Sequence, residues 1–314
     1  MLLEFSVENF LSFKDKVSFS MFANGTKGLD NNYVSVLDKK VLKTAAIYGA
    51  NASGKSNLFK ILSIVSNMIR ESSNVNINAK LPIIPFKFSE ENRNSVFEIK
   101  FIKNEIRYVY GFSANENEIT EEYLYYYPNG RESKIFDRTN ISEYSFPQGD
   151  AKSLIEIKEK TANNKFFLST ATHWNYSLTK PAYDFITQDL GVCFDTEELK
   201  TMAFNIYKND KDGNLKKFAL DFLKKADFNI IDYYVDEVDV PKELIPEPLR
   251  NFANKAFSTT FIHSNDDDKK YRMDYGEESI GTQVIFTLIP FISLAMEHRK
   301  VLIIDELDKS LHPF

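Results

Sequence analysis

The segment Gly49-Ala50-Asn51-Ala52-Ser53-Gly54-Lys55-Ser56 decides the fold of this chain. Glycines at positions 49 and 54, followed by lysine and serine, form a loop whose backbone N–H groups can turn toward phosphate oxygens. The short, largely apolar run 43–48 predicts a strand before this loop, and apolar residues between 58 and 69 recur at helical spacing after it. A strand, a glycine-rich loop and a helix in this order predict an α/β fold built around a nucleotide-binding P-loop.

Residue types within the loop suit separate tasks in binding a nucleoside triphosphate. We expect the backbone of residues 49–54 to surround phosphate oxygens, helped by the partial positive charge at the start of the following helix. The Lys55 side chain can reach the β- and γ-phosphates, and the Ser56 hydroxyl can bind Mg²⁺. A plain glycine turn is the alternative, and the strand and helix on either side argue against it.

Two adjacent carboxylates follow a second apolar run near the end of the chain. Val301-Leu302-Ile303-Ile304 is continuous and apolar, which is typical of a strand buried on both faces. Sheets of α/β proteins bind ligands at the carboxyl ends of their strands. We therefore expect Asp305 to hold Mg²⁺, and Glu306 to orient or deprotonate an attacking water as a catalytic residue. Two surface acids at a strand end are the alternative.

A third element is the sequence Ser279-Ile280-Gly281, which lies before an apolar helix expected over Thr282–Met296. A small polar residue and a glycine at a helix N-terminus provide another site suited to phosphate. An ordinary N-cap explains Ser279 equally well, so both interpretations remain open.

The remaining sequence predicts three parts. Residues 83–127 alternate as an antiparallel meander, and their aromatic density favours sheet packing over base stacking. The pattern of residues 153–265 predicts a mostly helical region, with amphipathic stretches at Leu215–Phe228 and Leu249–Phe257. We therefore expect an N-terminal lobe with an antiparallel sheet over 1–150, a helical insertion over 151–270 and a C-terminal lobe over 271–314.

Composition narrows the classes of function. The net charge of −6 gives nucleic-acid binding no support, although charge can be segregated on one face. The single cysteine, Cys193, cannot form an internal disulfide, which suits a reducing cytoplasm. The longest apolar run, Val284–Met296, is shorter than the roughly 20 residues of a membrane helix and contains Pro290. Four histidines and one cysteine give no zinc or nuclease constellation.

The three elements together resemble the ATP-binding heads of the ABC ATPase class, in its SMC, RecF and OLD-like branch. Asn51–Asn57 is similar to the Walker A motif of that branch, and Ser279 with Gly281 is similar to a shortened signature motif. Asp305–Pro313 resembles its Walker B motif and D-loop. Phe5–Phe13 resembles the N-terminal strand signature of bacterial "AAA family" ABC-type ATPases, many of which belong to phage-defence or abortive-infection systems.

This resemblance implies ATP and Mg²⁺ as cofactors and ATP hydrolysis as the activity. It places Lys55 among the catalytic residues and Asn57 among the nucleotide-binding ones. Ser279 and Gly281 would then reach the γ-phosphate bound to a second protomer, so that ATP lies between the copies of a homodimer or larger homo-oligomer. Hydrolysis would open this assembly and move the helical insertion.

Some positions depart from the family pattern. His312 stands where SMC-type heads carry an aspartate, which matches the OLD-like branch and makes His312 a catalytic candidate, with a packed or capping histidine as the alternative. Neither Gln148 nor Gln188 fits the Q-loop glutamine. The family pattern continues with another strand and a switch histidine beyond Phe314, so we expect either a fragment or a partner that supplies them.

The resemblance favours a sensor or motor subunit of a cytoplasmic anti-phage defence or DNA-transaction complex. Its effector would lie in a separate subunit or in a missing C-terminal domain. A second hypothesis is an ATP-gated scaffold with little turnover. A third is a RecF- or SMC-like DNA-repair ATPase, for which we would expect a basic face or a long heptad coiled coil.

Overall fold

The computed structural model divides the chain into two compact units. Unit 1 is Met1–Val192 and unit 2 is Cys193–Phe314, and each is described by itself. The boundary between them falls inside the region 151–270 that was expected as one insertion, and the three-part division remains a prediction. The residues that the structure describes are 1–24, 30–37, 39–88, 93–193, 196–226, 228–239, 255–264, 269–305 and 307.

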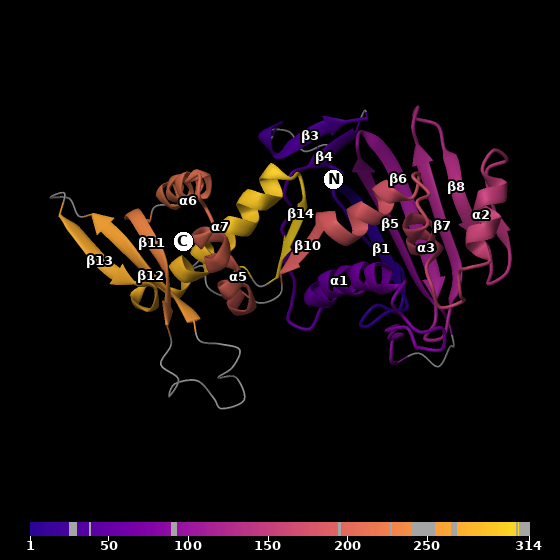
Figure 1. Cartoon of the computed structure of the whole chain (residues 1–314), viewed down its shortest axis with the longest axis horizontal. Helices are drawn as coiled ribbons and strands as arrows, with labels where there is room; N and C mark the ends of the chain where they lie inside the picture. The colour runs from indigo at the N-terminus through magenta and orange to yellow at the C-terminus, as the bar shows by residue number, and fades with distance from the viewer. Residues whose placement is uncertain are drawn as a thin grey trace. The chain divides into compact units, whose positions relative to one another are not determined.

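Unit 1 is built on a seven-stranded antiparallel sheet in the order β2-β1-β5-β6-β7-β8-β9 (Figure 1). Its central strands confirm the antiparallel meander predicted over 83–127. The N-terminal strand lies inside the sheet, between β2 and β5. The strands are β1 (Leu2–Glu8), β2 (Val17–Ser20), β5 (Ser95–Lys103), β6 (Ile106–Ala114), β7 (Ile119–Tyr127), β8 (Ser133–Arg138) and β9 (Tyr144–Ser145).

One face of this sheet is apolar because alternate side chains of each strand point to it. Phe97, on that face of β5, stacks on Phe112 of β6 with ring centroids 4.7 Å apart. Phe101 stacks on Phe185 at 4.1 Å. All four rings are buried, so the aromatic density of this region serves sheet packing, as predicted.

On the other face of the sheet, one tyrosine lies across a neighbouring strand. Tyr123 crosses Gly111 of the neighbouring strand, and its hydroxyl donates to a carboxylate oxygen of Glu98 at 2.6 Å. A Cβ atom on Gly111 would lie 2.3 Å from the Tyr123 hydroxyl oxygen. Glycine is therefore required at this point of the sheet, because any side chain would displace the tyrosine ring.

The helix that begins at the predicted loop packs on the apolar face of the sheet. Leu62 and Val65 of α1 surround a small internal cavity together with Phe5, Phe97 and Ile186. The other elements of unit 1 include a hairpin of β3 and β4. The bounds are α1 (Lys55–Glu71), α2 (Ala151–Lys158), α3 (Phe167–His173), α4 (Lys180–Asp184), the π-helix η2 (Phe185–Asp189), the 3₁₀ helix η1 (Asp30–Asn32), β3 (Tyr33–Val36), β4 (Lys39–Leu42) and β10 (Leu190–Cys193).

A fully buried carboxylate caps α3. The Glu122 side chain accepts hydrogen bonds from the N–H groups of Phe167 at 2.6 Å and Leu168 at 3.0 Å, and from the Tyr110 hydroxyl at 3.0 Å. These amides are at the N-terminus of the helix, where a negative charge is favourable. Burial nevertheless raises the pKa of Glu122, while the hydrogen bonds and the buried Arg138 guanidinium oppose that rise.

Unit 2 packs three helices against a three-stranded sheet of order β11-β12-β13. Tyr207 stacks on Phe286 with ring centroids 4.4 Å apart, and its hydroxyl donates to the Phe286 carbonyl at 2.8 Å. Phe261 of the sheet meets the same ring edge-on at 4.7 Å. The elements are α5 (Thr196–Lys208), α6 (Asn214–Lys225), β11 (Ile230–Asp239), β12 (Lys255–Ser264), β13 (Lys270–Asp274), the 3₁₀ helix η5 (Tyr275–Glu277), α7 (Ile280–Glu297) and β14 (Val301–Ile304).

The prediction of a mostly helical middle region is wrong beyond α6. The long antiparallel pair β11 and β12 occupies residues 230–239 and 255–264. Both segments are rich in β-branched and aromatic residues that suit a half-buried sheet. Of the helix predicted at Leu249–Phe257, residues 249–254 lie outside the described residues, and Phe257 belongs to β12.

Helix α7 confirms the helix predicted over Thr282–Met296 and begins two residues earlier. In the part of the chain that the structure describes, it is the one helix whose length and composition would allow it to cross a membrane. Buried core helices have the same composition, and Phe286 and Ile289 of α7 lie in the core of unit 2. This packing accounts for the apolar residues of α7 that lie in the core, and 33% of the helix is buried.

Candidate nucleotide-binding site

The glycine-rich loop ends in a helix whose first N–H groups are uncapped. Helix α1 begins at Lys55, and its N-cap, Gly54, has a left-handed φ of 93° with no side-chain cap among the described residues. The first helical hydrogen bond runs from the Leu58 N–H to the Gly54 carbonyl at 3.0 Å. The preceding N–H groups of the first turn therefore remain available to an anion, and the partial positive charge of the helix adds to their attraction.

The loop before the helix is tightly turned. The Ser53 N–H donates to the Ala50 carbonyl at 3.2 Å, and Ala52 has a φ of 63°. Non-glycine residues rarely adopt such angles, and they concentrate at ligand sites. A Cβ on Gly49 would lie 3.1 Å from Ser53 Oγ, so the loop closes on itself at a point where only glycine fits without adjustment.

The Lys55 side chain folds back over this loop. Its ammonium donates to the carbonyls of Gly49 at 2.6 Å and Ala50 at 2.9 Å. The positive charge thus lies beside the same loop whose helix presents free N–H groups. A phosphate group bound there can replace the two carbonyls as the acceptor for Lys55, so the charge and the donors fit a nucleotide phosphate chain.

The strand predicted before the loop is wrong for this structure. The described residues 44–50 contain no regular secondary structure, and Tyr48 is 85% exposed. A strand needs a neighbour that satisfies its backbone N–H and C=O groups, and within unit 1 these residues have no strand beside them among the described elements. The apolar run predicted the strand, but an apolar run alone does not provide a pairing partner.

In unit 2, Ser279 is the N-cap of α7. Its Oγ accepts a hydrogen bond from the Thr282 N–H at 3.1 Å and lies 2.8 Å from Thr282 Oγ1. Ser279 and Ile280 are exposed, and Gly281 lies in the first turn. The ordinary capping interpretation of Ser279 is thus confirmed, while a contact with phosphate remains a prediction.

A histidine–glutamate contact that no sequence pattern predicted supports this cap. His263 Nε2, on β12, lies 2.5 Å from a carboxylate oxygen of Glu278. The Glu278 carbonyl also accepts from the Gln283 side chain at 2.9 Å. The two residues are 15 positions apart, His263 on a strand and Glu278 in a connection, so no local spacing could have indicated their contact.

The site predicted at Asp305 and Glu306 is only partly described by the structure. Strand β14 confirms the predicted strand at Val301–Ile304, and Asp305 follows it directly. Glu306 and His312 lie outside the described residues. Over the described ranges, no group of three or more His, Cys, Asp or Glu could hold a metal ion. The Ser56 hydroxyl of unit 1 is exposed, and hydroxyl and carboxylate oxygens are donors of the kind that Mg²⁺ takes. A metal site formed by Ser56 and Asp305 remains a prediction.

A family comparison decides the class of the protein. Residues 45–314 match the family described as "AAA domain, putative AbiEii toxin, Type IV TA system". The chain belongs to this AAA family. Its match includes the whole glycine-rich loop and confirms the predicted resemblance to AAA-family ATPases.

Solved structures that match the chain include two SMC heads. One, "Crystal structure of the SmcHead bound to the C-winged helix domain of ScpA", is 12% identical with a TM-score of 0.44, and the match covers 99% of the AAA chain and 81% of that chain. The SMC head domain from Thermotoga maritima is 12% identical with a TM-score of 0.40, with coverage of 99% and 79%. No curated protein matches the chain.

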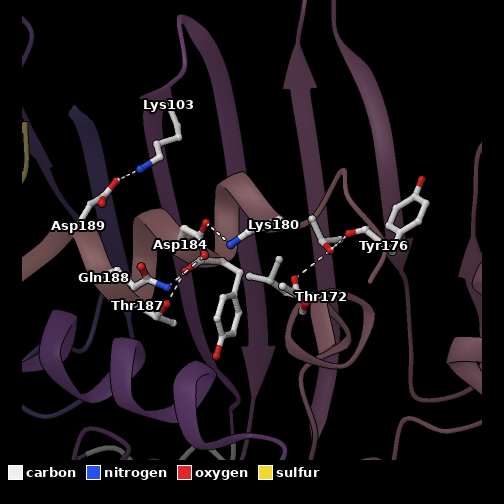
Figure 2. A network of polar contacts seen from close by, with 11 residues as sticks. Lys103, Thr172, Tyr176, Lys180, Asp184, Thr187, Gln188 and Asp189 are labelled. Carbon is white, nitrogen blue, oxygen red and sulfur yellow. Dashed lines mark hydrogen bonds and ion pairs between the residues drawn. The ribbon is translucent and has the colours of Figure 1, made fainter. Parts of the chain in front are cut away.

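The structure gives neither glutamine considered for a Q-loop a hydrogen bond to the glycine-rich loop among the described residues. Figure 2 shows Gln188 beside Asp184, to whose carboxylate its amide donates at 3.2 Å. Lys180 holds the same carboxylate at 2.6 Å, and Lys103 pairs with Asp189 nearby. Gln148 lies in a turn before α2.

Proposed function

We propose that this AAA protein binds Mg²⁺·ATP at Gly49–Ser56 and hydrolyses it to ADP and phosphate. The observation that carries the proposal is the uncapped N-terminus of α1 directly after a glycine loop, with the Lys55 ammonium folded over the same loop. Backbone donors, a helix dipole and the Lys55 ammonium together match the charge distribution of a triphosphate. Membership of the AAA family supports the same activity.

Each residue of the site would have a distinct task. The loop N–H groups and Lys55 would bind the β- and γ-phosphates and stabilise the charge that develops as the terminal phosphate leaves. Ser56 and Asp305 would hold Mg²⁺, which neutralises phosphate charge when bound. Glu306 would orient the attacking water and accept its proton. His312 is a further candidate for a catalytic residue, beside Glu306.

The signature-like residues would complete the site of a second copy. Ser279 and Gly281 lie at the exposed N-terminus of a helix of 18 residues, which would attract the γ-phosphate bound to a partner protomer. ATP would then join two copies, and hydrolysis would release them. A homodimer, or a larger assembly built on it, follows from this arrangement.

We place the protein in the cytoplasm, as sensor or motor of a bacterial anti-phage defence or DNA-transaction complex. The family description, which names a toxin of a type IV toxin–antitoxin system, supports the defence role. A separate subunit or a further domain would carry the effector activity. The net charge of −6 gives no support for nucleic acid as the trigger.

Phosphate release from Mg²⁺·ATP tests the proposal. We expect measurable turnover by the full chain, and none above background from Lys55→Ala or Glu306→Gln, with Glu306→Gln still binding ATP. If the full chain binds ATP but releases no more phosphate than Glu306→Gln, the ATP-gated scaffold would be the better description. If it binds no ATP, the nucleotide site itself would be wrong.

A further inference from the structure

The turn after β1, residues Asn9–Phe13, is firmly anchored to the body of unit 1. The buried Asn9 side chain donates to the Arg93 carbonyl at 2.6 Å. The turn is closed by reciprocal backbone hydrogen bonds between Phe10 and Phe13, at 2.9 and 3.0 Å, and the Phe10 ring is fully buried. An anchored turn can hold the side chains at its tip in fixed positions.

The tip of this turn lies against the glycine-rich loop. A Cβ built on Gly54 would lie 2.8 Å from Ser12 Oγ and 3.2 Å from the Phe13 ring. The Asn57 side-chain amide reaches across from the first turn of α1 and donates to Ser12 Oγ at 3.0 Å. Ser12 thus sits beside the N-terminus of α1, although it is far from this helix in sequence.

In this contact the Ser12 hydroxyl oxygen is the acceptor. An amide nitrogen can only donate, so the Asn57 bond uses a lone pair of Ser12 and leaves its hydrogen to donate elsewhere. Ser12 is exposed, and among the described residues no other hydrogen bond to its side chain is seen. The hydrogen is therefore available for an acceptor that binds beside Gly54.

We propose that Ser12 is an additional phosphate-binding residue, whose hydroxyl is oriented by Asn57 to donate to an oxygen of the nucleotide's phosphate chain. Phe13 holds the left-handed Gly54 in place against the same turn. This inference rests on the proposed ATP site, because the acceptor it names is the phosphate bound there. The alternative is that the Ser12–Asn57 contact only joins the turn to the helix.

Binding of Mg²⁺·ATP and Mg²⁺·ADP by the full chain, measured by titration calorimetry, separates these possibilities. The variants are Ser12→Ala, Ser12→Thr, Asn57→Ala and the double variant Ser12→Ala/Asn57→Ala, with the exposed strand residue Ser18→Ala as the matched control. Thermal unfolding without nucleotide is measured for each. The unfolding midpoint reports any purely structural role of the contact.

We expect Ser12→Ala to raise the Kd for nucleotide roughly 10-fold, the effect of losing one hydrogen bond to a charged group, with an unchanged unfolding midpoint. Ser12→Thr keeps the hydroxyl and should bind within about 3-fold of the unaltered chain. Asn57→Ala should weaken binding similarly, and the double variant should be no weaker than the worse single one, because both changes remove the same interaction.

Three results would overturn the inference. The first is that Ser12→Ala binds nucleotide as tightly as Ser18→Ala. The second is that weaker binding by Ser12→Ala comes with a lowered unfolding midpoint that Ser12→Thr does not restore. The third is that the effects of Ser12→Ala and Asn57→Ala on binding add in the double variant. Absence of nucleotide binding by the unaltered chain would remove the proposed ATP site and this inference together. Normal binding by that chain with an unaffected Ser12→Ala would remove the inference alone.

Discussion

His263 Nε2 lies 2.5 Å from a carboxylate oxygen of Glu278, the residue directly before the N-cap of α7. The Glu278 side chain is only 6% exposed and that of His263 is 20% exposed, so the pair is largely shielded from water. It ties strand β12 to the start of α7 inside unit 2. The geometry of the predicted phosphate-binding end of α7 thus depends on a residue far from it in sequence.

Removing His263 should leave a nearly buried carboxylate without its partner. We predict that His263→Ala lowers the free energy of unfolding by about 1–3 kcal/mol, the usual cost of an unsatisfied buried acceptor. Urea denaturation followed by circular dichroism measures the change. The matched control is His298→Ala, at the exposed C-terminus of the same helix, where we expect little change. Equal stability of the two variants would show that the pair contributes nothing.

The buried Glu122 predicts a pH dependence. Burial is the largest cause that raises its pKa above 4.5, so the folded chain binds a proton at Glu122 more readily than the unfolded chain does. Its contribution to stability is then fully present below the unfolded pKa and is lost as the pH rises through the folded pKa. We therefore compare the free energy of unfolding of the unaltered chain with that of Glu122→Gln. The difference in favour of the unaltered chain should shrink as the pH rises from about 4 toward neutrality.

Denaturation of both proteins over that pH range provides the measurement. The difference in unfolding free energy is compared at each pH, so groups common to both proteins cancel. A difference that grows with pH would mean that the hydrogen bonds from α3 and Tyr110 outweigh burial and keep the carboxylate charged.

Gly111 gives a prediction about the outer face of the sheet. Gly111→Ala would place a methyl group 2.3 Å from the Tyr123 hydroxyl oxygen, so the ring must leave and its bond to Glu98 must break. We expect a loss of about 1–3 kcal/mol in unfolding free energy. Gly149→Ala is the control, because a Cβ there meets nothing within 4 Å. The clash is removed in the double variant Gly111→Ala/Tyr123→Ala, which should lose less than the sum of its single changes.

The sequence predicted the parts of the fold whose pattern is local. The meander and α1 follow from hydrophobic periodicity, α7 and β14 follow from continuous apolar runs, and the capping role of Ser279 follows from residue type. The helix predicted over part of β12 failed because tertiary pairing overrides weak amphipathic periodicity. The contacts Ser12–Asn57 and His263–Glu278 join distant segments, and no single-sequence pattern encodes such contacts.

Ser279 allows the capping role and the predicted role across a dimer to be separated. Asp and Asn are both good N-caps, so Ser279→Asp and Ser279→Asn should each preserve α7. The aspartate alone places a negative charge where a partner's γ-phosphate would bind. We predict that Ser279→Asp keeps the stability of the unaltered chain and the ATP affinity of a single copy, but loses ATP-dependent dimerisation.

Both Ser279 changes are made in a chain that also carries Glu306→Gln, so that ATP turnover does not interfere. Light scattering with and without Mg²⁺·ATP then measures dimerisation. The asparagine variant should still dimerise, although more weakly, since the side chain is larger but uncharged. If the aspartate variant dimerises as fully as the asparagine variant, then no phosphate lies near Ser279 in the assembly. The exposed N-terminus of α7 would then serve only the fold of unit 2, and the ATP-dependent contact would have to be sought on another surface.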